Sequence, residues 1–183
     1  RRKGNKGRKK TGPITDFLSI EERPAEVADR IIPGHWEGDL LIGSRNASAL
    51  GTLLERTTRM AFLVKLENQD ARIVRKAFAE EFRHLPKGLK RTLTYDQGQE
   101  MAQHKLFTKE TDITVYFAHP HSPWERGSNE NTNALLRQYF PKGTDFTRIS
   151  KRRLKEVQDE LNDRPRKTLG WYTPHEKFCE VLR

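Results

Sequence analysis

The sequence predicts one α/β domain built on a mixed five-stranded sheet flanked by helices. Three observations support this fold class. At 183 residues the chain is long enough for one domain with a full core and short for two. Three strand-like runs follow one another with hairpin-sized gaps, and helix-like and strand-like patterns then alternate. Residues 1–24 show no such pattern, so we expect them to be a basic, flexible N-terminal segment and linker, with the domain at 25–183.

Most of the net charge lies at the start of the chain. The formal net charge is +10, and residues 1–10 hold seven basic side chains and no acidic one, which leaves +3 for the rest. Such a run repels itself and has nothing apolar to bury, so we expect it to stay disordered until it meets a polyanion. DNA or RNA is the natural partner. A solvated linker without a dedicated partner is the alternative.

Composition also excludes several classes of protein. The single cysteine, Cys179, excludes an internal disulfide and a cysteine-based zinc cluster, which fits a reducing compartment. No apolar stretch approaches the roughly 20 residues that cross a bilayer, and no signal-peptide pattern follows the basic start. We therefore expect a soluble intracellular protein with no membrane partner. The chain begins at Arg1 rather than methionine, which is consistent with an excerpt of a longer protein.

The first half of the domain is predicted to be an antiparallel meander followed by a helix. Apolar runs predict strands at 35–43, 49–58 and 60–66, because the gaps between them are hairpin-sized. The next segment, 70–85, has apolar residues at three- and four-residue spacing and is closed by proline and glycine, as an amphipathic helix should be. Its apolar stripe is Ala71, Val74, Phe78, Phe82 and Leu85.

The second half alternates strands and helices. We expect a strand at 92–95, a short helix at 101–110, a strand at 113–118 and a helix that starts near Ser128. A last helix at about 150–163 has apolar residues on one side and charges on the other. Three antiparallel strands followed by helix, strand, helix, strand and helix is the element order of a ribonuclease H-like fold.

Three acidic residues have unusual contexts. Asp39 interrupts an apolar strand, Asp96 ends one, and Glu130 lies at the start of a helix. A charge inside a buried strand needs compensation. No lysine or arginine lies within five residues of Asp39, which favours a divalent cation as the compensating charge. Taken alone, Asp96 is equally explained as a turn residue and Glu130 as a first-turn carboxylate.

Together, the three carboxylates predict a metal-dependent site. They converge at one sheet edge if the strand of Asp39 pairs beside that of Asp96 and the helix of Glu130 packs across both. Carboxylates about 4 Å apart repel by roughly 4 kcal/mol per pair at an effective dielectric near 20, so bound cations are needed. Oxygen ligands favour Mg²⁺ or Mn²⁺ over zinc. Two such ions would activate a water or a 3′-hydroxyl and stabilise the leaving oxygen of a phosphodiester.

The residues around these carboxylates carry a more specific signal than their spacing. The segments GHWEGDL at 34–40, TYDQGQEM at 94–101 and HSPWERGSNENTN at 121–133 closely resemble the catalytic region of insertion-sequence-thirty family transposases. So do the segments 54–59, 136–144 and 161–170, and the resemblance runs from about Arg23 to the C-terminus. It implies a retroviral-integrase-like fold and a catalytic, metal-binding DDE triad at Asp39, Asp96 and Glu130. The 33 residues between Asp96 and Glu130 suit the family's short second interval.

The resemblance also implies an activity and partners. It implies Mg²⁺- or Mn²⁺-dependent DNA strand cleavage at transposon ends, followed by joining to target DNA. Coordinated cutting of two ends implies a homodimer or higher oligomer in a DNA complex, in the bacterial cytoplasm at the nucleoid. Full-length relatives carry N-terminal helix-turn-helix regions, and nothing ahead of residue 24 can form one. We therefore expect a catalytic fragment or a truncated copy.

Basic and amide side chains near the triad are candidate DNA contacts. Contacts to phosphates supply affinity without reading the sequence. Asn133 and Arg137 have an alternative as solvated helix surface, and Trp124 either stacks on a base or anchors its loop on the core. We expect His119 and His121 to shape the site or touch DNA rather than bind metal. The candidate DNA-binding residues are Arg126, Asn129, Asn133, Arg137, Lys142, Arg164, Arg166 and Lys167.

Two other functions remain open from the sequence. A non-catalytic DNA-binding remnant could regulate or compete with an intact transposase, consistent with the basic tail. A ribonuclease H-like nuclease unrelated to transposition would cut but not join strands. Salt-sensitive DNA binding without nicking would indicate the remnant, and cleavage without strand transfer would indicate the nuclease.

Overall fold

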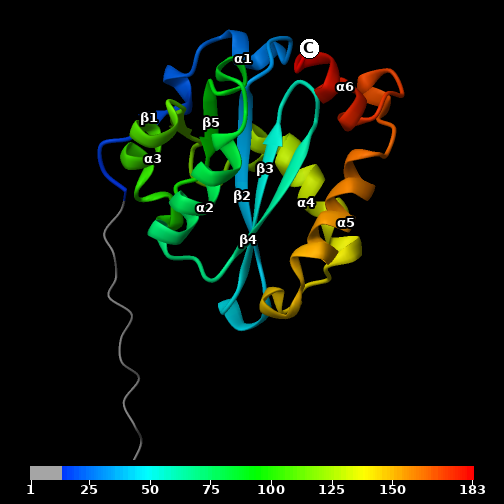
Figure 1. The fold of residues 1–183 in the computed structure, drawn as a ribbon. Helices are drawn as coiled ribbons and strands as arrows, with labels where there is room; N and C mark the ends of the chain where they lie inside the picture. Colours follow the sequence, from blue (N-terminus) through cyan, green and yellow to red (C-terminus); the bar gives the residue numbers. More distant parts are fainter. Residues whose placement is uncertain (1–13) are drawn as a thin grey trace, which may run out of the picture.

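The computed structural model describes residues 14–183 as a mixed six-stranded sheet with helices on both faces (Figure 1). The strand order is β1-β6-β5-β2-β3-β4. The strands are β1 Leu18–Ser19, β2 His35–Ile42, β3 Ala49–Glu55, β4 Ala61–Leu66, β5 Thr92–Tyr95 and β6 Thr114–Phe117.

The sheet joins an antiparallel half to a parallel half. The strands β2, β3 and β4 form the predicted antiparallel meander, in which Asp39 pairs with Thr52. On the other side of β2, β5 pairs in parallel, and β6 and then β1 continue that parallel half. The strand β2 is therefore central, with neighbours of opposite direction on its two sides.

Helices cover the sheet in two layers. The pair α2 and α3 lies on one face and the pair α4 and α5 on the other (Figure 1). Side-chain caps fix where some of them begin: Asp70 accepts a hydrogen bond from Arg72 N at the start of α2, and Ser150 accepts one from Arg153 N at the start of α5. The helices are α1 Glu26–Asp29, α2 Ala71–Arg83, α3 His104–Thr111, α4 Gly127–Tyr139, α5 Lys151–Asn162 and α6 Pro174–Val181.

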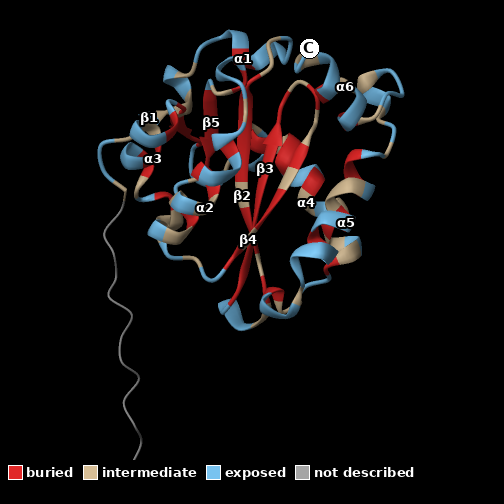
Figure 2. Cartoon of the chain, in the orientation of Figure 1, coloured by how far each residue is buried: buried red, intermediate tan, exposed pale blue. Residues whose placement is uncertain are grey.

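Each face of the sheet has its own hydrophobic core. The core under α2 and α3 includes Trp36, Phe78 and Phe107, whereas the core under α4 and α5 includes Leu41 and Leu136. Figure 2 shows the central strands buried between these layers. Because side chains alternate along a strand, Trp36 and Leu40 of β2 enter the first core. The residues between and after them, Glu37, Asp39 and Leu41, face α4 and α5.

Within residues 14–183, the structure contains one strand and two α-helices that the sequence did not predict, which are β1, α1 and α6. The predicted sheet of five strands is short by one, because the unpredicted strand β1 pairs with β6. This strand lies in the segment expected to be a linker, where Phe17 also packs against Phe117 with ring centroids 5.3 Å apart. Helix α6 was not predicted either. The expected disordered tail at 1–13 lies outside the described residues, and the division at residue 24 stays a prediction.

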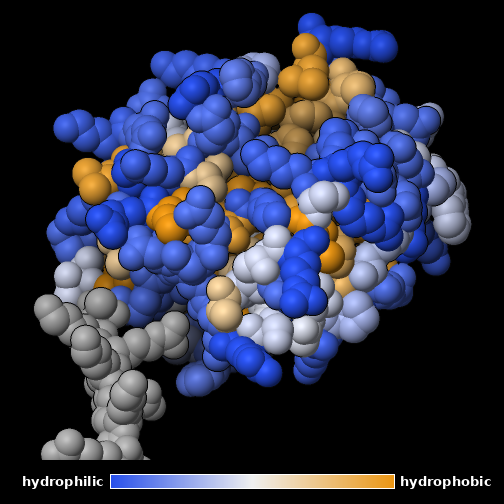
Figure 3. Space-filling view, turned by 60° about the horizontal axis from the view of Figure 1, so that its bottom comes forward, coloured by the Kyte–Doolittle hydropathy of each residue, from blue (hydrophilic) through white to orange (hydrophobic). Residues whose placement is uncertain are grey.

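The surface is mainly polar. Figure 3 shows one face on which hydrophilic side chains surround small apolar patches. Among residues 14–183, every helix is too short or too polar to cross a lipid bilayer.

Candidate active site

Asp39 and Asp96 lie beside each other near the middle of the sheet. Asp39 is in β2, and Asp96 directly follows β5, the strand next to it (Figure 1). The parallel register pairs Glu37 with Thr94. Two residues further along both strands, the same register brings Asp39 alongside Asp96, with both side chains on the α4 face. The structure therefore brings these two predicted residues together.

A glycine allows the two strands to pack this way. A Cβ added to Gly38 would lie 2.7 Å from the ring of Tyr95, which fills the space beside β2. Tyr95 is fully buried, and its hydroxyl has no hydrogen-bond partner among the described residues. Gly38 thus sets the spacing between the strands that carry the two aspartates.

The cation between these aspartates is Arg126. Its Nη2 donates to Asp96 Oδ2 at 3.2 Å, and its Nη1 lies 3.5 Å from Asp39 Oδ1. The expectation that no basic residue compensates Asp39 is therefore corrected. The partner is distant in sequence, in the 3-10 turn Pro123–Arg126 that leads into α4, and neighbouring residues could not indicate it.

Glu130 lies on the same side of α4 as the residues that contact Asp39. At 3.6 residues per turn, Glu130 and Asn133 lie about 60° apart around α4, and Arg126 precedes the helix as its N-cap residue. Glu130 is exposed, and its side chain makes no hydrogen bond or ion pair to another described residue. Within residues 14–183, no group of three or more His, Cys, Asp or Glu side chains is arranged to hold a metal ion. The structure thus brings two of the three predicted carboxylates together, those of Asp39 and Asp96. Glu130 lies on α4, outside the hydrogen bonds and ion pairs that join them.

The oxygen atoms of both aspartates are held in place. Asp39 Oδ1 accepts from Leu40 N and Oδ2 accepts from Asn133 Nδ2, each at 2.8 Å. Asp96 Oδ1 accepts from Gly98 N at 3.0 Å. These bonds fix the orientation of both carboxylates, through the backbone of β2, the side chain of Asn133 in α4 and the turn after β5.

The electrostatics of this cluster suit a hard divalent cation. Burial raises the pKa of Asp39; Arg126 opposes this rise, and the carboxylate of Asp96 adds to it. Asn133 Oδ1 is buried and, among the described residues, lacks a hydrogen-bond donor. The donor set is therefore all oxygen, rich in negative charge and incompletely neutralised. These residues fit Mg²⁺ or Mn²⁺ in chemistry, since both ions take oxygen ligands.

A fourth carboxyl group lies next to the site and was missed from the sequence. A Cβ on Gly98 would lie 2.3 Å from Glu100 Oε1, so this carboxyl packs against the turn that holds Asp96. Burial raises the pKa of Glu100, and Asp96 and then Asp39 raise it further. The sequence signal for this carboxyl group is the position of Glu100 four residues after Asp96, in the segment 94–101 that resembles the transposase family.

A separate buried network anchors α4 to the sheet. Glu37 Oε1 accepts from Arg56 Nη1 at 2.7 Å, with the two side chains 0% and 5% exposed. Glu37 Oε2 accepts from Asn129 N at 2.8 Å, and Thr52 donates to Asn129 Oδ1 at 3.1 Å. This network fixes the first turn of α4, which carries Arg126 and Glu130 over the aspartates.

The predicted DNA contacts divide into internal and surface residues. Asn129 is fully buried, so its position does not support a DNA contact. Arg126 and Asn133 are bound to the aspartates, which makes them parts of the site. Arg137 instead donates to Ile42 O, at the end of β2, at 3.2 Å. Two lysines, Lys142 and Lys167, are exposed, whereas Arg164 and Arg166 are half-buried.

The loop before α4 is held by an ion pair and exposes its tryptophan. His119 Nδ1 lies 2.8 Å from Glu125 Oε1, and this contact raises the pKa of His119. Trp124 is 72% exposed. It therefore does not anchor the loop on the core, and its ring is available for stacking.

Comparison with known proteins identifies relatives of this chain. The model of the integrase core domain matches residues 30–123, a span that includes both aspartates and stops before Glu130. The transposase for insertion sequence element IS1086 of Cupriavidus metallidurans is 49% identical, covering 97% of this chain and 52% of that protein. Transposase InsI for insertion sequence element IS30A of Escherichia coli K12 is 44% identical, covering 96% of this chain and 46% of that protein. The chain spans about half the length of these relatives.

Solved structures agree on the fold. The catalytic core domain of BIV integrase superposes with a TM-score of 0.60, covering 81% of this chain and 95% of that chain. The sequence identity is 17%, so this likeness concerns the fold alone. The prediction of a ribonuclease H-like, retroviral-integrase-like fold is confirmed.

Proposed function

This chain belongs to the integrase core domain family, among the insertion-sequence-thirty transposases, and from this premise we propose that it cuts and joins DNA strands at transposon ends by metal-dependent phosphoryl transfer. The observation that carries the proposal is the pairing of Asp39 and Asp96 with one guanidinium group, that of Arg126. The two aspartates come from neighbouring strands and both lie within ion-pair distance of it. Glu130 completes the catalytic and metal-binding set from the helix packed above them.

Asp39, Asp96 and Glu130 would hold Mg²⁺ or Mn²⁺. When bound, such ions supply Lewis acidity at the phosphodiester and lower the pKa of an attacking water or hydroxyl. Glu130 lies on an exposed helix face without a competing partner among the described residues, so it can approach a ligand from the solvent side.

The remaining residues of the site position and balance charge. Asn133 and Leu40 N each hold one oxygen of Asp39, and Gly98 N holds Asp96. Arg126 reduces the repulsion between the two aspartates and is placed to meet a phosphate that approaches them. Preorganised charges of this kind are worth more in a partly buried site than in water.

DNA is the proposed substrate, and the exposed basic residues are its proposed contacts. Lys142 and Lys167 lie on the surface, and Arg164 is half-buried beside Tyr139. Phosphate contacts by such side chains give affinity that falls as salt rises. We place two or more copies in the active complex, because two transposon ends must be cut together.

A cleavage assay tests the proposal. The chain is incubated with Mg²⁺ and a labelled duplex that carries the terminal repeats of its own insertion element. Asp39→Asn, Asp96→Asn and Glu130→Gln should each lower cleavage by more than about 100-fold, the upper range for groups that only orient metal ligands.

Matched controls use the same chemical changes on exposed residues. Asp112→Asn and Glu67→Gln remove surface carboxylates away from the aspartates and should leave cleavage unchanged. Undiminished cleavage by any triad variant would remove that residue from the chemistry. Salt-sensitive binding with no nicking in Mg²⁺ or Mn²⁺ would indicate a DNA-binding remnant, and cut ends without joined products would indicate a nuclease.

A further inference from the structure

A second basic site lies on the other flank of α4. A cavity of about 350 Å³ is lined by three arginines and by small polar side chains, and none of its lining residues is acidic. The lining includes Arg30, Arg59, Arg166, Ser128, Asn131 and Thr168. Three guanidinium groups with no acidic residue in the lining define a site for an anion, because the paired N–H donors of an arginine fit the oxygens of a phosphate.

The arginines come from three separate parts of the chain. Arg30 ends α1 in a left-handed backbone conformation with φ 55°, and Arg59 lies in the β3–β4 turn with φ 64°. The third, Arg166, is held in its loop by a hydrogen bond from its Nη2 to Leu161 O at 2.9 Å. The cavity is therefore assembled by the tertiary fold rather than by a run of neighbouring basic residues.

The positive charge in this cavity is only partly balanced by nearby acidic groups, since Glu37 and Glu55 favour the charged form of Arg59 but do not line the cavity. Arg30 makes no hydrogen bond or ion pair to the rest of residues 14–183, and Arg59 donates to the hydroxyl of Ser128. Burial lowers the pKa of Arg59, and the nearby charge of Arg30 lowers it further. Like charges held together in this way are relieved when an anion binds between them.

The cavity and the aspartates share one helix. Gly127, Ser128 and Asn131 line the cavity, whereas Arg126 and Asn133 of the same helix region face Asp39. An α-helix with its side chains is about 10 Å across, which corresponds to about three steps of 3.4 Å along a DNA strand. A duplex that reaches the aspartates and runs across α4 would therefore meet this cavity within a few nucleotides.

We propose that the Arg30, Arg59 and Arg166 cavity binds a backbone phosphate of duplex DNA, a few nucleotides from the phosphate at the aspartates. This inference rests on the proposed function, since it takes DNA as the substrate. The contact holds the duplex across α4 and carries no sequence preference. The ligand of the cavity is a phosphodiester monoanion, which accepts hydrogen bonds from two or more of the guanidinium groups.

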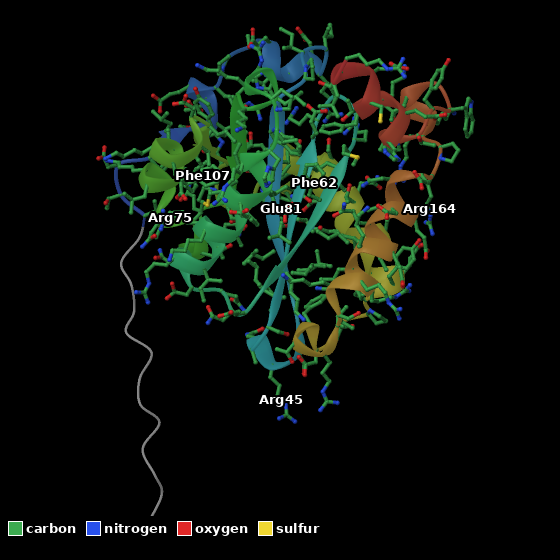
Figure 4. All side chains as sticks on the ribbon, viewed as in Figure 1. Arg45, Phe62, Arg75, Glu81, Phe107 and Arg164 are labelled. Carbon is green, nitrogen blue, oxygen red and sulfur yellow. The ribbon has the colours of Figure 1, made fainter. Side chains whose placement is uncertain are left out.

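Substitution of Arg30 tests the cavity with a closely matched control. Arg45 lies at the tip of the β2–β3 hairpin, at the opposite end of the molecule from α1 (Figures 1 and 4). It shares the left-handed backbone of Arg30, with φ 52° against 55°. Arg30→Asn and Arg45→Asn thus remove the same charge from the same backbone conformation, and asparagine tolerates that conformation well.

Duplex binding is measured by fluorescence anisotropy over a series of salt concentrations, without metal ions. Arg30→Asn should weaken binding and reduce the salt slope by about 0.9, the value for one phosphate contact. Arg45→Asn should follow the unmodified chain. Asn131→Asp places a carboxylate in the cavity without changing its size and should weaken binding further, because the carboxylate repels a phosphate.

Equal binding by Arg30→Asn and Arg45→Asn would overturn this inference. A thermal-shift titration with inorganic phosphate separates another source of the same chemistry. Stabilisation by phosphate that is lost in Arg30→Asn, with DNA binding unchanged, would assign the cavity to a free phosphate and also overturn it. Because binding is measured without metal, a failure of the cleavage assay would reject the proposed function and leave this result intact.

Discussion

Two carboxylates on β2, Glu37 and Asp39, face the same helix and have opposite surroundings. The side chain of Glu37 is 0% exposed, and its two oxygens are taken by Arg56 and Asn129 N. The side chain of Asp39 is 22% exposed and shares Arg126 with Asp96, which is 39% exposed. Strand alternation puts both on one face, yet one is enclosed and the other opens to solvent.

The difference separates a carboxylate with a structural role, Glu37, from the one that we propose as a metal ligand, Asp39. A buried, fully hydrogen-bonded charge pair fixes one arrangement and is costly to break, because either partner alone would be an uncompensated buried charge. A carboxylate pair that shares one cation retains unmet negative charge and access for a ligand. Glu37 therefore holds α4 in place. The position of α4 in turn places Asn133 beside Asp39.

The largest expected effect is on catalysis. Asp39→Asn should abolish most metal-dependent DNA cleavage, a loss of more than about 100-fold, while the protein stays folded. The neutral amide keeps the shape of the side chain and loses the charge that attracts the cation. Single-turnover cleavage with Mg²⁺ measures the loss, and circular dichroism checks the fold. Cleavage within a few-fold of the unmodified chain would show that Asp39 is not a metal ligand.

The next largest effect is on the stability of the fold and follows from substitution of the buried carboxylate, Glu37. Glu37→Gln should lower the free energy of unfolding by about 3–5 kcal/mol, because it leaves Arg56 buried without its counter-charge. Urea denaturation measures this change. Arg56→Met with Glu37→Gln removes both charges, and we expect it to recover part of the loss. A stability equal to that of the unmodified chain would mean that the pair does not anchor α4.

Orientation of Asp39 by Asn133 should matter less than the carboxylate itself. Asn133→Ala removes the hydrogen bond to Asp39 Oδ2 and should reduce cleavage about 10- to 100-fold, as other groups that orient metal ligands do. Raising the Mn²⁺ concentration should restore part of the rate, since the expected defect is in metal affinity. A loss that excess metal does not relieve would point instead to contact with DNA.

The smallest effect is a pH dependence of stability with a defined sign. The pKa of Asp39 is raised in the folded protein, so this group destabilises the fold when it ionises. Its stabilising contribution is complete below the unfolded pKa of about 3.9 and is lost as pH rises through the folded pKa. In metal-free buffer, Asp39→Asn should be slightly more stable than the unmodified chain at neutral pH. A lower stability of the variant there would contradict the shift.

The sequence could predict the elements whose signals are local. Apolar periodicity indicated β2 to β6 and α2 to α5 to within a few residues, because each buries one face against the sheet. The segments β1, α1 and α6 were missed, and α1 is only four residues long. The two residues of β1 have almost no pattern of their own, and α6 is short and carries few apolar residues. Both depend on contacts with distant parts of the chain.

The sequence could predict the two aspartates of the candidate site but not the residues that pair with them. Asp39 and Asp96 interrupt or end apolar runs, and that signal is local. Their shared partner Arg126 is not, since ion pairing across the fold leaves no trace in neighbouring residues. The same reason explains why Asn129 was assigned to DNA and why the cavity at Arg30 was not foreseen, because burial and grouping are tertiary properties.

The central claim is that Asp39, Asp96 and Glu130 hold divalent cations for DNA strand cleavage. Anomalous scattering from Mn²⁺ in crystals of this chain with a bound duplex tests it most directly. We predict density bounded by the carboxylates of Asp39 and Asp96, with Glu130 brought into the coordination sphere. Saturating Mn²⁺ without density between these carboxylates, or ions bound without Glu130, would contradict the account.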